Sequence, residues 1–478
     1  MKKFQKIFSF LTALGILTGS AISMSVNALP EVSSDFSQDT VNFYQQWKEK
    51  YVKQDTYVTN EQQYYVWYSE SMYAGNNQSV EVTVSEAHGY GMLIFAQMAE
   101  QDSSAKDYFD GMYRYYKAHP SSIGANLMSW QQCDNGMTLI DGAEEGSMTG
   151  GFCDSATDGD MDIAYSLLLA DAVWGSDGEI NYLESAKAMI ADIMTYDVNH
   201  EYWTLTLGDW VSECDSSESY YHATRTSDFI LSYLPEFAKV SGDENWMKVY
   251  HTTYEIITEL TATYQNGILP DFVIRDADGT WKASPADFLE SENDGDYYYN
   301  ACRDPWRISM DYLINQNETA KIYAEQISNF MKTTTNSDPW EIMAGYHMDG
   351  TAFEDYSDLC FTAPVLLAAK ATGDIQWHDQ LRDVIVNYGD DVYYGDTIKL
   401  LCLMADDTDY SNNSSNPSDD PIRGDVNADG EFSLVDLISM QKWLHSQGTL
   451  ADWKAGDLDH DGKITVYDFC LMKLELLK

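Results

Sequence analysis

The segment DFLESENDGDYYYNACRDPWR, residues 287–307, combines many side chains that could do chemistry. It contains six carboxyl groups, three tyrosines and two arginines within 21 residues. This composition indicates a polar and aromatic site. Because acid–base chemistry needs one carboxyl group that holds a proton and another that accepts one, the segment raises the question of which group accepts it.

A second carboxyl group stands at the start of a predicted helix, in TVSEAHGYGML, residues 83–93. Glu86 follows Ser85 there, and Gly89 and Gly91 lie in the first turns. Glycines at these positions would let a ligand approach the backbone, at a cost in helix stability. A plainer interpretation is that Glu86 only complements the helix dipole.

Three more carboxyl groups precede a wholly apolar helical segment in ATDGDMDIAYSLLLADAVW, residues 156–174. They belong to Asp158, Asp160 and Asp162. One aspartate could cap the helix and the others could be solvated. Since three acids exceed what a cap requires, a role in a pocket is an equal alternative.

The elements that must position these groups are helices. Apolar residues recur at i, i+3, i+4 and i+7 in five long segments, whereas strand-like alternation is scarce. Gly-, Asp- and Trp-rich loops between them are too long to be simple turns. The sequence therefore predicts a mainly α fold with long functional loops on one side, and the five segments are HGYGMLIFAQMAEQ, MDIAYSLLLADAVW, EINYLESAKAMIADIMTY, TSDFILSYLPEFAKV and NWMKVYHTTYEIITELTATY.

Composition restricts the class of protein. The 478 residues include 77 Asp and Glu against 28 Lys and Arg, a net charge of −49. Such a chain would be repelled by nucleic acids and by anionic membrane surfaces. Residues 1–28 combine three lysines, an apolar run and small residues at a cleavage site, so we expect a signal peptide and a secreted, extracellular protein.

The chain divides at a polar segment. DDTDYSNNSSNPSDDP, residues 406–421, has no apolar periodicity and is predicted to be a linker. It separates a large domain, residues 29–405, from a small one, residues 422–478. The seven cysteines are widely spaced without a CxxC pair, which favours mostly free, buried thiols over a disulfide framework.

The small domain is a repeat. GDVNADGEFSLVDLISMQKWL is followed 32 residues later by GDLDHDGKITVYDFCLMKLEL, and each copy has oxygen ligands at the spacing of a calcium loop, with glycine at position 6. Two acidic turns would be a plainer interpretation, but duplication argues against it. Two Ca²⁺ ions are thus predicted, with ligands Asp425, Asn427, Asp429, Glu431 and Asp436, then Asp457, Asp459, Asp461, Lys463 and Asp468, of which Glu431 and Lys463 contribute backbone carbonyls.

This duplicated loop–helix pair resembles a dockerin, the module that attaches secreted enzymes to cohesin modules of a scaffold protein. The resemblance covers residues 424–477 and implies a cohesin as partner. Loop positions 10 and 11, residues 434–435 and 466–467, lie where dockerins select their cohesin, and here they are apolar. An exported enzyme on such a scaffold would act on an extracellular polymer.

The large domain resembles glycoside hydrolase family 8 over residues 45–402. The two segments with Glu86 and Asp158 fit two of its motifs, and further segments follow in the family's order. The resemblance implies an (α/α)6 barrel and an endo-acting, inverting enzyme for β-1,4-linked glucan-like chains, with no cofactor for catalysis. The further segments are NLMSWQ, GDW, TRTSDF and YNACRDPWRISMDYL.

The resemblance also implies roles for individual residues. Glu86 would be the general acid, with a pKa kept high by an apolar pocket or a nearby carboxylate. Asp158 would lie beside the sugar at the cleavage point and stabilise developing positive charge. The remaining residues expected to bind substrate or hold neighbouring polar groups are Trp130, Trp210, Tyr299, Asn300 and Arg303, although either tryptophan could be a core residue.

The sequence departs from the family at the general base. Most members have aspartate where this chain has Asn300, and an amide has no useful basicity. A subgroup with chitosanases and β-1,3-1,4-glucanases also has Asn there and takes its base from an upstream loop. In SPADFLESENDGD, Glu290 after Phe288 and Leu289 fits best; the alternatives are Glu292, Asp294 and Asp296. An inverting pair would place its carboxyl groups roughly 6.5–9.5 Å apart.

These resemblances favour a secreted endo-β-glucanase that cuts β-1,4 or mixed β-1,3-1,4 glucan and is attached to a cellulosome-like scaffold. We expect a monomer. A chitosanase is the alternative within the family, since an acidic surface would attract cationic chitosan. Xylan is a weaker alternative. A protein that has lost its base and only binds carbohydrate is the alternative from another class.

Overall fold

The computed structural model describes residues 36–68, 79–142, 153–389 and 392–410 of the large domain. In the C-terminal part it describes residues 423–427, 432–445, 448, 450, 453–458 and 463–476. The predicted signal peptide lies outside the described residues. Within the described residues, no helix is both long and apolar enough to cross a membrane.

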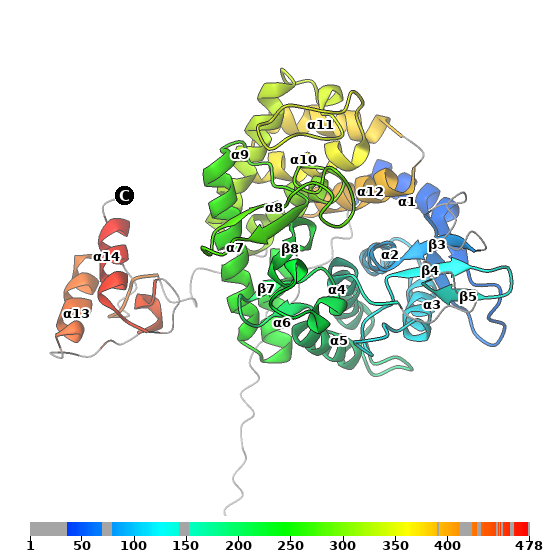
Figure 1. Cartoon of the computed structure of the whole chain (residues 1–478), viewed down its shortest axis with the longest axis horizontal. Helices are drawn as coiled ribbons and strands as arrows, with labels where there is room; N and C mark the ends of the chain where they lie inside the picture. The colour runs from blue at the N-terminus through cyan, green and yellow to red at the C-terminus, as the bar shows by residue number, and fades with distance from the viewer. Residues whose placement is uncertain are drawn as a thin grey trace, which may run out of the picture.

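The large domain is an (α/α)6 barrel, as the resemblance predicted (Figure 1). Among the inner helices, α2 packs on α4, α8 on α10 and α10 on α12, and α12 closes the ring against α2. The 3₁₀ turn at residues 231–233 packs on both α6 and α8 and connects them. The inner helices are α2 (Ser85–Gln97), α4 (Thr157–Trp174), α6 (Leu234–Ser241), α8 (Asp304–Asn315), α10 (Leu359–Thr372) and α12 (Tyr393–Asp407). The outer helices are α1 (Gln38–Tyr51), α3 (Ala105–Ala118), α5 (Tyr182–Tyr196), α7 (Asn245–Tyr264), α9 (Glu318–Thr334) and α11 (Ile375–Asn387).

The apolar pattern of each helix explains its place in the ring. Inner helices α4 and α10 are buried on nearly every side, and their sequences are apolar all round. Outer helices such as α3 and α9 bury one face only and expose charged residues on the other. For these helices the apolar pattern thus matches the position in the inner or outer ring.

One predicted helix is wrong over half its length. Residues 226–240 were expected to form a continuous helix, but residues 226–228 and 231–233 form two separate 3₁₀ turns, and α6 begins only at Leu234. Pro235 in the first turn of α6 fits a helix start, because its missing N–H is not needed there. By contrast, α7 covers the fifth predicted segment completely.

Two small antiparallel sheets carry loops at the ends of inner helices. In the first, β3 (Val80–Val84), β4 (Gln131–Asp134) and β5 (Leu139–Asp141) lie in sequence order, and β3 runs directly into α2. In the second, β9 (Phe272–Arg275) lies between β8 (Ala223–Arg225) and β10 (Trp281–Ala283). The segment 284–300 leaves the end of β10. Two further antiparallel pairs are present in the described residues: β1 (Val52–Gln54) pairs with β2 (Tyr64–Val66), and β6 (Val198–Asn199) pairs with β7 (Thr204–Leu205).

The glycines of the two motif segments have a structural role that differs from the predicted one. A Cβ on Gly89 would lie 2.7 Å from Asp162 Cβ, and a Cβ on Gly159 would lie 2.8 Å from the backbone carbonyl carbon of Ser85. The helix that approaches Gly89 is therefore α4, not a ligand. Gly91 likewise faces the side chain of Val66, at 2.5 Å from a Cβ.

The described start of the predicted linker belongs to the barrel. Asp406 and Asp407 are the last residues of α12, and both form ion pairs with Arg382 of α11. Thr408 is buried, and Lys370 donates a hydrogen bond of 2.9 Å to its carbonyl. The helical domain thus includes at least Tyr410, and the boundary after residue 405 is too early.

The cysteines are free, as predicted. None of the seven forms a disulfide in the described residues; five are buried, Cys214 is half-buried and Cys470 is exposed. Burial raises the pKa of the Cys153 thiol to about 12, so this thiol is not reactive near neutral pH.

Among its described residues the C-terminal domain contains two α-helices, α13 (Leu434–Leu444) and α14 (Val466–Glu475). They pack around a small apolar core that includes Val426, Met440 and Met472. The domain is therefore all-α with its own core, as expected for a duplicated loop–helix unit.

The close contact of α2 and α4 yields a test. We expect Gly159→Ala to lower the free energy of unfolding by about 1–3 kcal/mol, because the added methyl would overlap the backbone at Ser85. It should also lower activity, since Glu86 and Asp158 stand at this contact. Urea unfolding and initial rates measure both effects. The matched control is Gly178→Ala, whose Cβ would meet nothing within 4 Å; equal stability losses in the two variants would contradict the explanation.

Candidate active site

Glu86 lies at the first turn of α2, two residues after β3. The backbone N–H of Ser85 donates a hydrogen bond of 2.8 Å to the carbonyl of Trp130, which fixes the helix start against β4. Burial and then the negative charge of Asp158 raise the pKa of Glu86 to about 7. Glu86 can therefore hold a proton near neutral pH, as a general acid must.

Asp158 remains ionised in the same surroundings. Its carboxylate is buried and accepts a hydrogen bond of 2.6 Å from Arg303 Nη1. Burial alone would raise the pKa of Asp158, but the positive charges of Arg303 and then Arg225 lower it below its usual value. Two neighbouring carboxyl groups thus have pKa values moved in opposite directions, which is the pattern of an acid paired with a stabilising anion.

Arg303 links three elements. Besides Asp158, its Nη1 donates to the hydroxyl of Tyr90 at 3.0 Å, and its Nη2 donates to Asn300 Oδ1 at 3.0 Å. Asp158 begins α4, Tyr90 lies in α2 and Arg303 immediately precedes α8. The predicted role of Arg303 in holding a neighbouring polar group corresponds to these contacts.

The orientation of the Asn300 amide is fixed by its partners. Since Oδ1 accepts from Arg303, the Nδ2 group points the other way, to Glu290 Oε2 at 2.9 Å and to Asp271 Oδ2 at 3.3 Å. Asn300 therefore acts as a donor towards two carboxylates. Because an amide is not basic, Asn300 cannot be the general base, as expected from the sequence.

Glu290 stands at the edge of this network. Its Oε1 lies 3.5 Å from Arg225 Nη2, and its side chain is 44% exposed, so it is open to water as well as held by Asn300. Phe288 anchors the loop by packing on Phe272 and Tyr220. Leu289, expected to be part of the anchor, is instead 38% exposed.

The alternative bases have other positions. Asp294 is buried and accepts hydrogen bonds from the backbone N–H groups of Leu289, Glu290 and Ser291, which shapes the loop. Asp296 pairs with His347 at 2.9 Å. Glu292 is exposed, and its side chain forms no hydrogen bond or ion pair with any residue that the structure describes.

Two residues of the network were missed from the sequence. Arg225 ends β8 and Asp271 precedes β9, and pairing of these strands places them side by side. Asp271 is buried and accepts the backbone N–H groups of Tyr298, Asn300 and Ala301. Burial raises the pKa of Asp271 to about 7 although these hydrogen bonds oppose the rise. Arg225 lies within the quoted segment TRTSDF, so its charge could have been noticed, whereas nothing local distinguishes Asp271.

The aromatic residues predicted to bind substrate are partly accessible. Trp130 and Trp210 are both half-buried, and Trp210 contacts Tyr220 edge to face with ring centroids 5.2 Å apart. Tyr299 bonds to the hydroxyl of Tyr356 and to Asp358 through its own hydroxyl. None of the three is a fully buried core residue, so each retains surface for a ligand.

The other two acids of the second motif have structural roles. Asp160 accepts the backbone N–H of Met128 at 2.9 Å. Asp162 forms a buried ion pair with Arg307, with an Nη2–Oδ2 distance of 2.5 Å. One helical turn along α4 and α8, this pair repeats the contact between Asp158 and Arg303.

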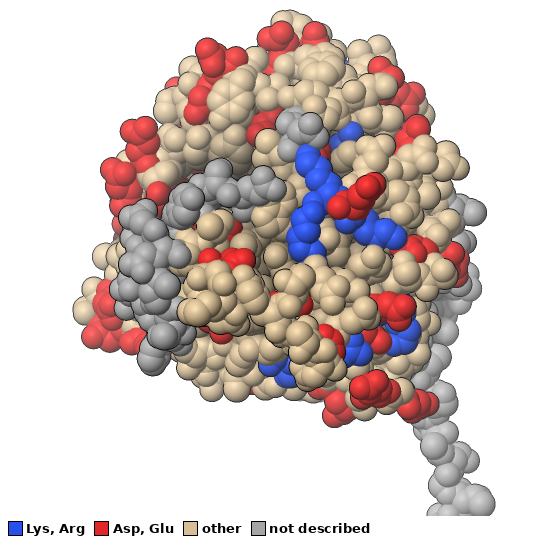
Figure 2. Space-filling model, turned by 90° about the vertical axis from the view of Figure 1, so that its right-hand side faces the viewer, with Lys and Arg blue, Asp and Glu red and all other residues tan. Residues whose placement is uncertain are grey.

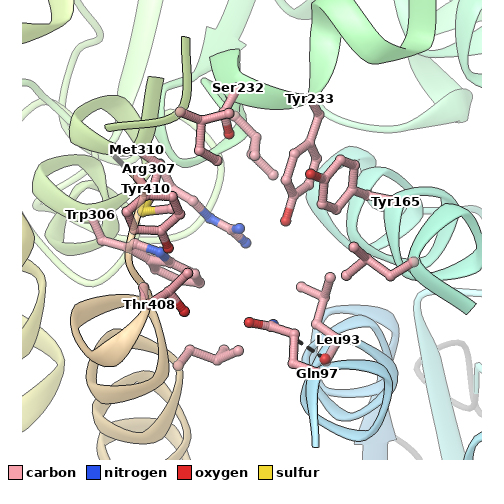
Figure 3. Close-up of a pocket in the computed structure, with 15 residues that line it drawn as sticks. Leu93, Gln97, Tyr165, Ser232, Tyr233, Trp306, Arg307, Met310, Thr408 and Tyr410 are labelled. Carbon is pink, nitrogen blue, oxygen red and sulfur yellow. Dashed lines mark hydrogen bonds between the residues drawn. The ribbon is translucent and has the colours of Figure 1, made fainter. Parts of the chain in front are cut away.

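A small cavity of about 90 Å³ lies beyond the pair of Asp162 and Arg307 (Figure 3). It is lined by residues such as Tyr165, Tyr233, Trp306 and Arg307. Glu86, Asp158, Asn300 and Glu290 are not among the residues that line it. The cavity is therefore not the site of the chemistry.

The calcium loops are described only in part. Four predicted ligands, Asp429, Glu431, Asp459 and Asp461, lie outside the described residues, and those that are described contain no group of three metal-binding side chains. Among the other six, the side chains of Asp425, Asp436, Asp457 and Asp468 are buried.

The two loops are built in the same way. Asp436 accepts the backbone N–H groups of Asn427 and Ser433, while Asp468 accepts those of Leu458 and Thr465. Each position-12 carboxylate thus ties the start of its loop to the following helix. Buried carboxylates at matching places fit a hard divalent cation with oxygen ligands.

Comparison with protein families gives two matches. Residues 23–408 match the model of the glycosyl hydrolases family 8, and residues 423–477 match the dockerin type I domain. The first match covers most of the chain and contains every residue of the network around Arg303.

Relatives of known name are similar over most of the large domain. A beta-glucanase of Niallia circulans is 41% identical over 362 residues, which are 75% of this chain and 81% of the relative. Endoglucanase A of Acetivibrio thermocellus is 30% identical over 383 residues, 76% of this chain and 72% of the relative.

Solved structures agree in fold. The apo structure of a beta-1,3-1,4-glucanase from Paenibacillus sp. X4 has a TM-score of 0.70 and 38% identity, covering 80% of this chain and 98% of that one. A xylanase from Teredinibacter turnerae has a TM-score of 0.61 at 18% identity, covering 78% and 95%, and shows the fold alone.

The opposed pKa values of Glu86 and Asp158 predict a pH dependence. A group with a raised pKa keeps its proton up to that pH, so activity that needs protonated Glu86 is lost as the pH rises through about 7. Asp158→Asn removes a charge that raises this pKa. We therefore expect the alkaline limb of the kcat/KM profile to move to lower pH in the residual activity. Asp171→Asn, at the far end of α4, serves as the control, and an unmoved limb in Asp158→Asn would overturn the assignment.

Proposed function

Because the chain belongs to glycosyl hydrolase family 8 and ends in a dockerin type I domain, we propose that it is a secreted, inverting endo-β-glucanase attached to a cellulosome. The beta-glucanase and endoglucanase relatives support hydrolysis of β-1,4 or mixed β-1,3-1,4 glucan. The glucanase structure at 38% identity supports the same substrate class.

In the proposed mechanism Glu86 donates its proton to the oxygen of the leaving sugar. Asp158, kept ionised by Arg303, stabilises the positive charge that develops on the sugar ring. A water molecule between the sugar and Glu290 attacks the anomeric carbon from the opposite face and gives its proton to Glu290. The attack inverts the configuration at that carbon.

The observation that carries the proposal is the hydrogen-bond chain from Asp158 through Arg303 and Asn300 to Glu290. It ties the loop carboxylate to the site of the buried acid and anion. Glu290 is partly exposed and accepts from a neutral donor, as a base that must bind water requires. Glu292 has no such tie, which favours Glu290.

Chitosan is the second candidate substrate. The chain carries a net charge of −49, and Asp and Glu are spread over the face in Figure 2, where Lys and Arg form a row near the centre and a few separate groups below it. Such a surface attracts a cationic polymer. The relatives reported above are glucanases, and we therefore place β-glucan first.

The dockerin domain implies a cohesin as partner and an extracellular location. Its loops would each bind one Ca²⁺ through side-chain oxygens at positions 1, 3, 5 and 12, with Asp436 and Asp468 at position 12. Side chains at loop positions 10 and 11 are available for docking, since Val435, Val466 and Tyr467 are 54%, 65% and 60% exposed.

A product panel tests substrate and base together. Purified enzyme should release reducing sugar from barley β-glucan, with products of inverted configuration by NMR. Glu290→Ala should lower kcat by about 10²–10⁴-fold while retaining binding, since the general base is lost. Azide should restore part of the rate, because it attacks without giving up a proton.

The matched control is Glu292→Ala, two residues along the same loop, which should keep nearly full activity. If Glu292→Ala is inactive and Glu290→Ala is active, the base is assigned wrongly. If the enzyme releases reducing sugar from chitosan but not from β-glucan, chitosan is the substrate. If it releases reducing sugar from neither polymer, the result favours a protein that only binds carbohydrate.

Removal of calcium should abolish the function of the C-terminal domain and leave hydrolysis by the large domain unchanged. We expect chelation by EDTA to abolish binding to a cohesin and to lower the helical signal of the isolated C-terminal domain, because buried carboxylates would lose their counter-charge. Asp436→Ala should act in the same direction, whereas Lys454→Ala should not. Hydrolysis by the full chain should be unchanged, and undiminished cohesin binding without calcium would contradict the ligand assignment.

A further inference from the structure

A second concave site lies on the outside of the barrel, where the ring closes. It has a volume of about 400 Å³ and is bounded by α1, by the segment after α11 and by α12. In Figure 1 these elements lie together at one side of the ring. The volume is within the range of about 300–1,000 Å³ that is typical of small-molecule sites. We call this site the seam groove; none of the catalytic side chains described above lines it.

The charge of the seam groove is balanced. Its charged side chains are Asp39 and Asp396, opposed by Lys50 and Lys399. The formal charge of the groove is therefore zero, in a chain whose net charge is −49. A groove without net charge selects neither a cation nor an anion, and it fits an uncharged ligand rich in hydroxyl groups.

The groove offers both kinds of contact that such a ligand uses. Exposed amides of Asn42, Gln46 and Asn387 line it. Asn42 Oδ1 already accepts from Gln38 and Asn387 Nδ2 already donates to Asp383, so Asn42 offers its NH₂ group and Asn387 its carbonyl oxygen to a ligand. Phe43 and Tyr388 supply aromatic surface. Next to Tyr388, at a centroid distance of 4.9 Å, the ring of Trp340 is 47% exposed and continues this surface outward. Aromatic rings with amides beside them suit the apolar faces and hydroxyl edges of sugars.

The walls of the groove are fixed before a ligand binds. Lys399 is 3% exposed; its Nζ donates to the carbonyl of Tyr388 at 2.6 Å and lies 4.0 Å from the centroid of Phe43. Asp396 accepts the hydroxyl of Tyr51 at 2.6 Å. Since these groups are already ordered, a ligand would not have to order them, and this favours binding.

We propose that the seam groove is a second β-glucan-binding site, separate from the catalytic residues. The proposal rests on the proposed function for the identity of the polysaccharide. A long chain could occupy both sites of one molecule, and the second contact would then be intramolecular. The groove would thus hold the enzyme on polymeric substrate and have no effect on short oligosaccharides.

Binding without turnover tests the proposal. The full chain carrying Glu86→Gln is run in native gels that contain barley β-glucan, with and without the added changes Asn42→Ala, Gln46→Ala and Trp340→Ala. We expect the added changes to weaken retardation by about fivefold to tenfold, the effect of losing one or two net hydrogen bonds and an aromatic contact. The matched control is Gln45→Ala, an exposed neighbour on α1 that does not line the groove.

A second measurement separates binding from damage to the fold. With Glu86 intact, the triple variant should hydrolyse a short mixed-linkage oligosaccharide at the wild-type rate and the polymer more slowly at low concentration. Unchanged retardation in the gel, or a parallel loss on the oligosaccharide, would overturn the proposal. Wild-type enzyme without activity on any β-glucan would instead overturn the proposed function, which the gel does not measure.

Discussion

The ion pair between Arg303 and Asp158 is the interaction on which the site depends. Both side chains are buried, and the two residues stand at the starts of α8 and α4, which α6 separates in the ring. A buried ion pair is tolerated only when its remaining hydrogen bonds are satisfied, and Arg303 also donates to Tyr90 and Asn300. Removal of either partner would leave an unpaired buried charge, so the contact between α4 and the start of α8 and the geometry of the candidate site depend on the same ion pair.

The arginines also determine which carboxyl groups carry a charge. Glu86 and Asp158 both lie in a desolvated site, which would raise the pKa of each. Asp158 is in direct contact with Arg303, so its pKa falls, and its charge then helps to raise that of Glu86. Arg225 has its own pKa raised, because the charges of Glu290, Asp228 and Asp158 outweigh the effect of burial. Burial is common to Glu86 and Asp158, so it cannot distinguish them. Direct contact with Arg303 makes Asp158 the anion and leaves Glu86 as the group with the raised pKa.

The sequence predicted the parts of this structure that local patterns determine. Helical periodicity predicted α7 over its full length, and motif segments singled out Glu86, Asp158 and Arg303, which the structure brings into one network. Contacts between distant segments were not predictable in the same way. The close approach of α4 to Gly89 and the hydrogen bonds between Asp271 and Asn300 are properties of the assembled barrel. The sequence placed Asp406 and Asp407 in a solvated linker because two adjacent acids usually face water. Their ion pairs with Arg382, which belongs to another helix, could not be predicted from local sequence.

The amide at position 300 and the carboxylate at position 290 are best understood as a single arrangement. Asn300 Nδ2 donates to both Glu290 and Asp271, so the amide separates two acids that would otherwise face each other. A carboxylate at position 300 would place three acids within hydrogen-bonding distance, and at least one would have to take a proton. The amide avoids that crowding, because its Nδ2 group donates to Glu290 at 2.9 Å and to Asp271 at 3.3 Å. The amide at position 300 therefore orients the carboxylate at position 290, and the two departures from the family pattern form one hydrogen-bonded arrangement.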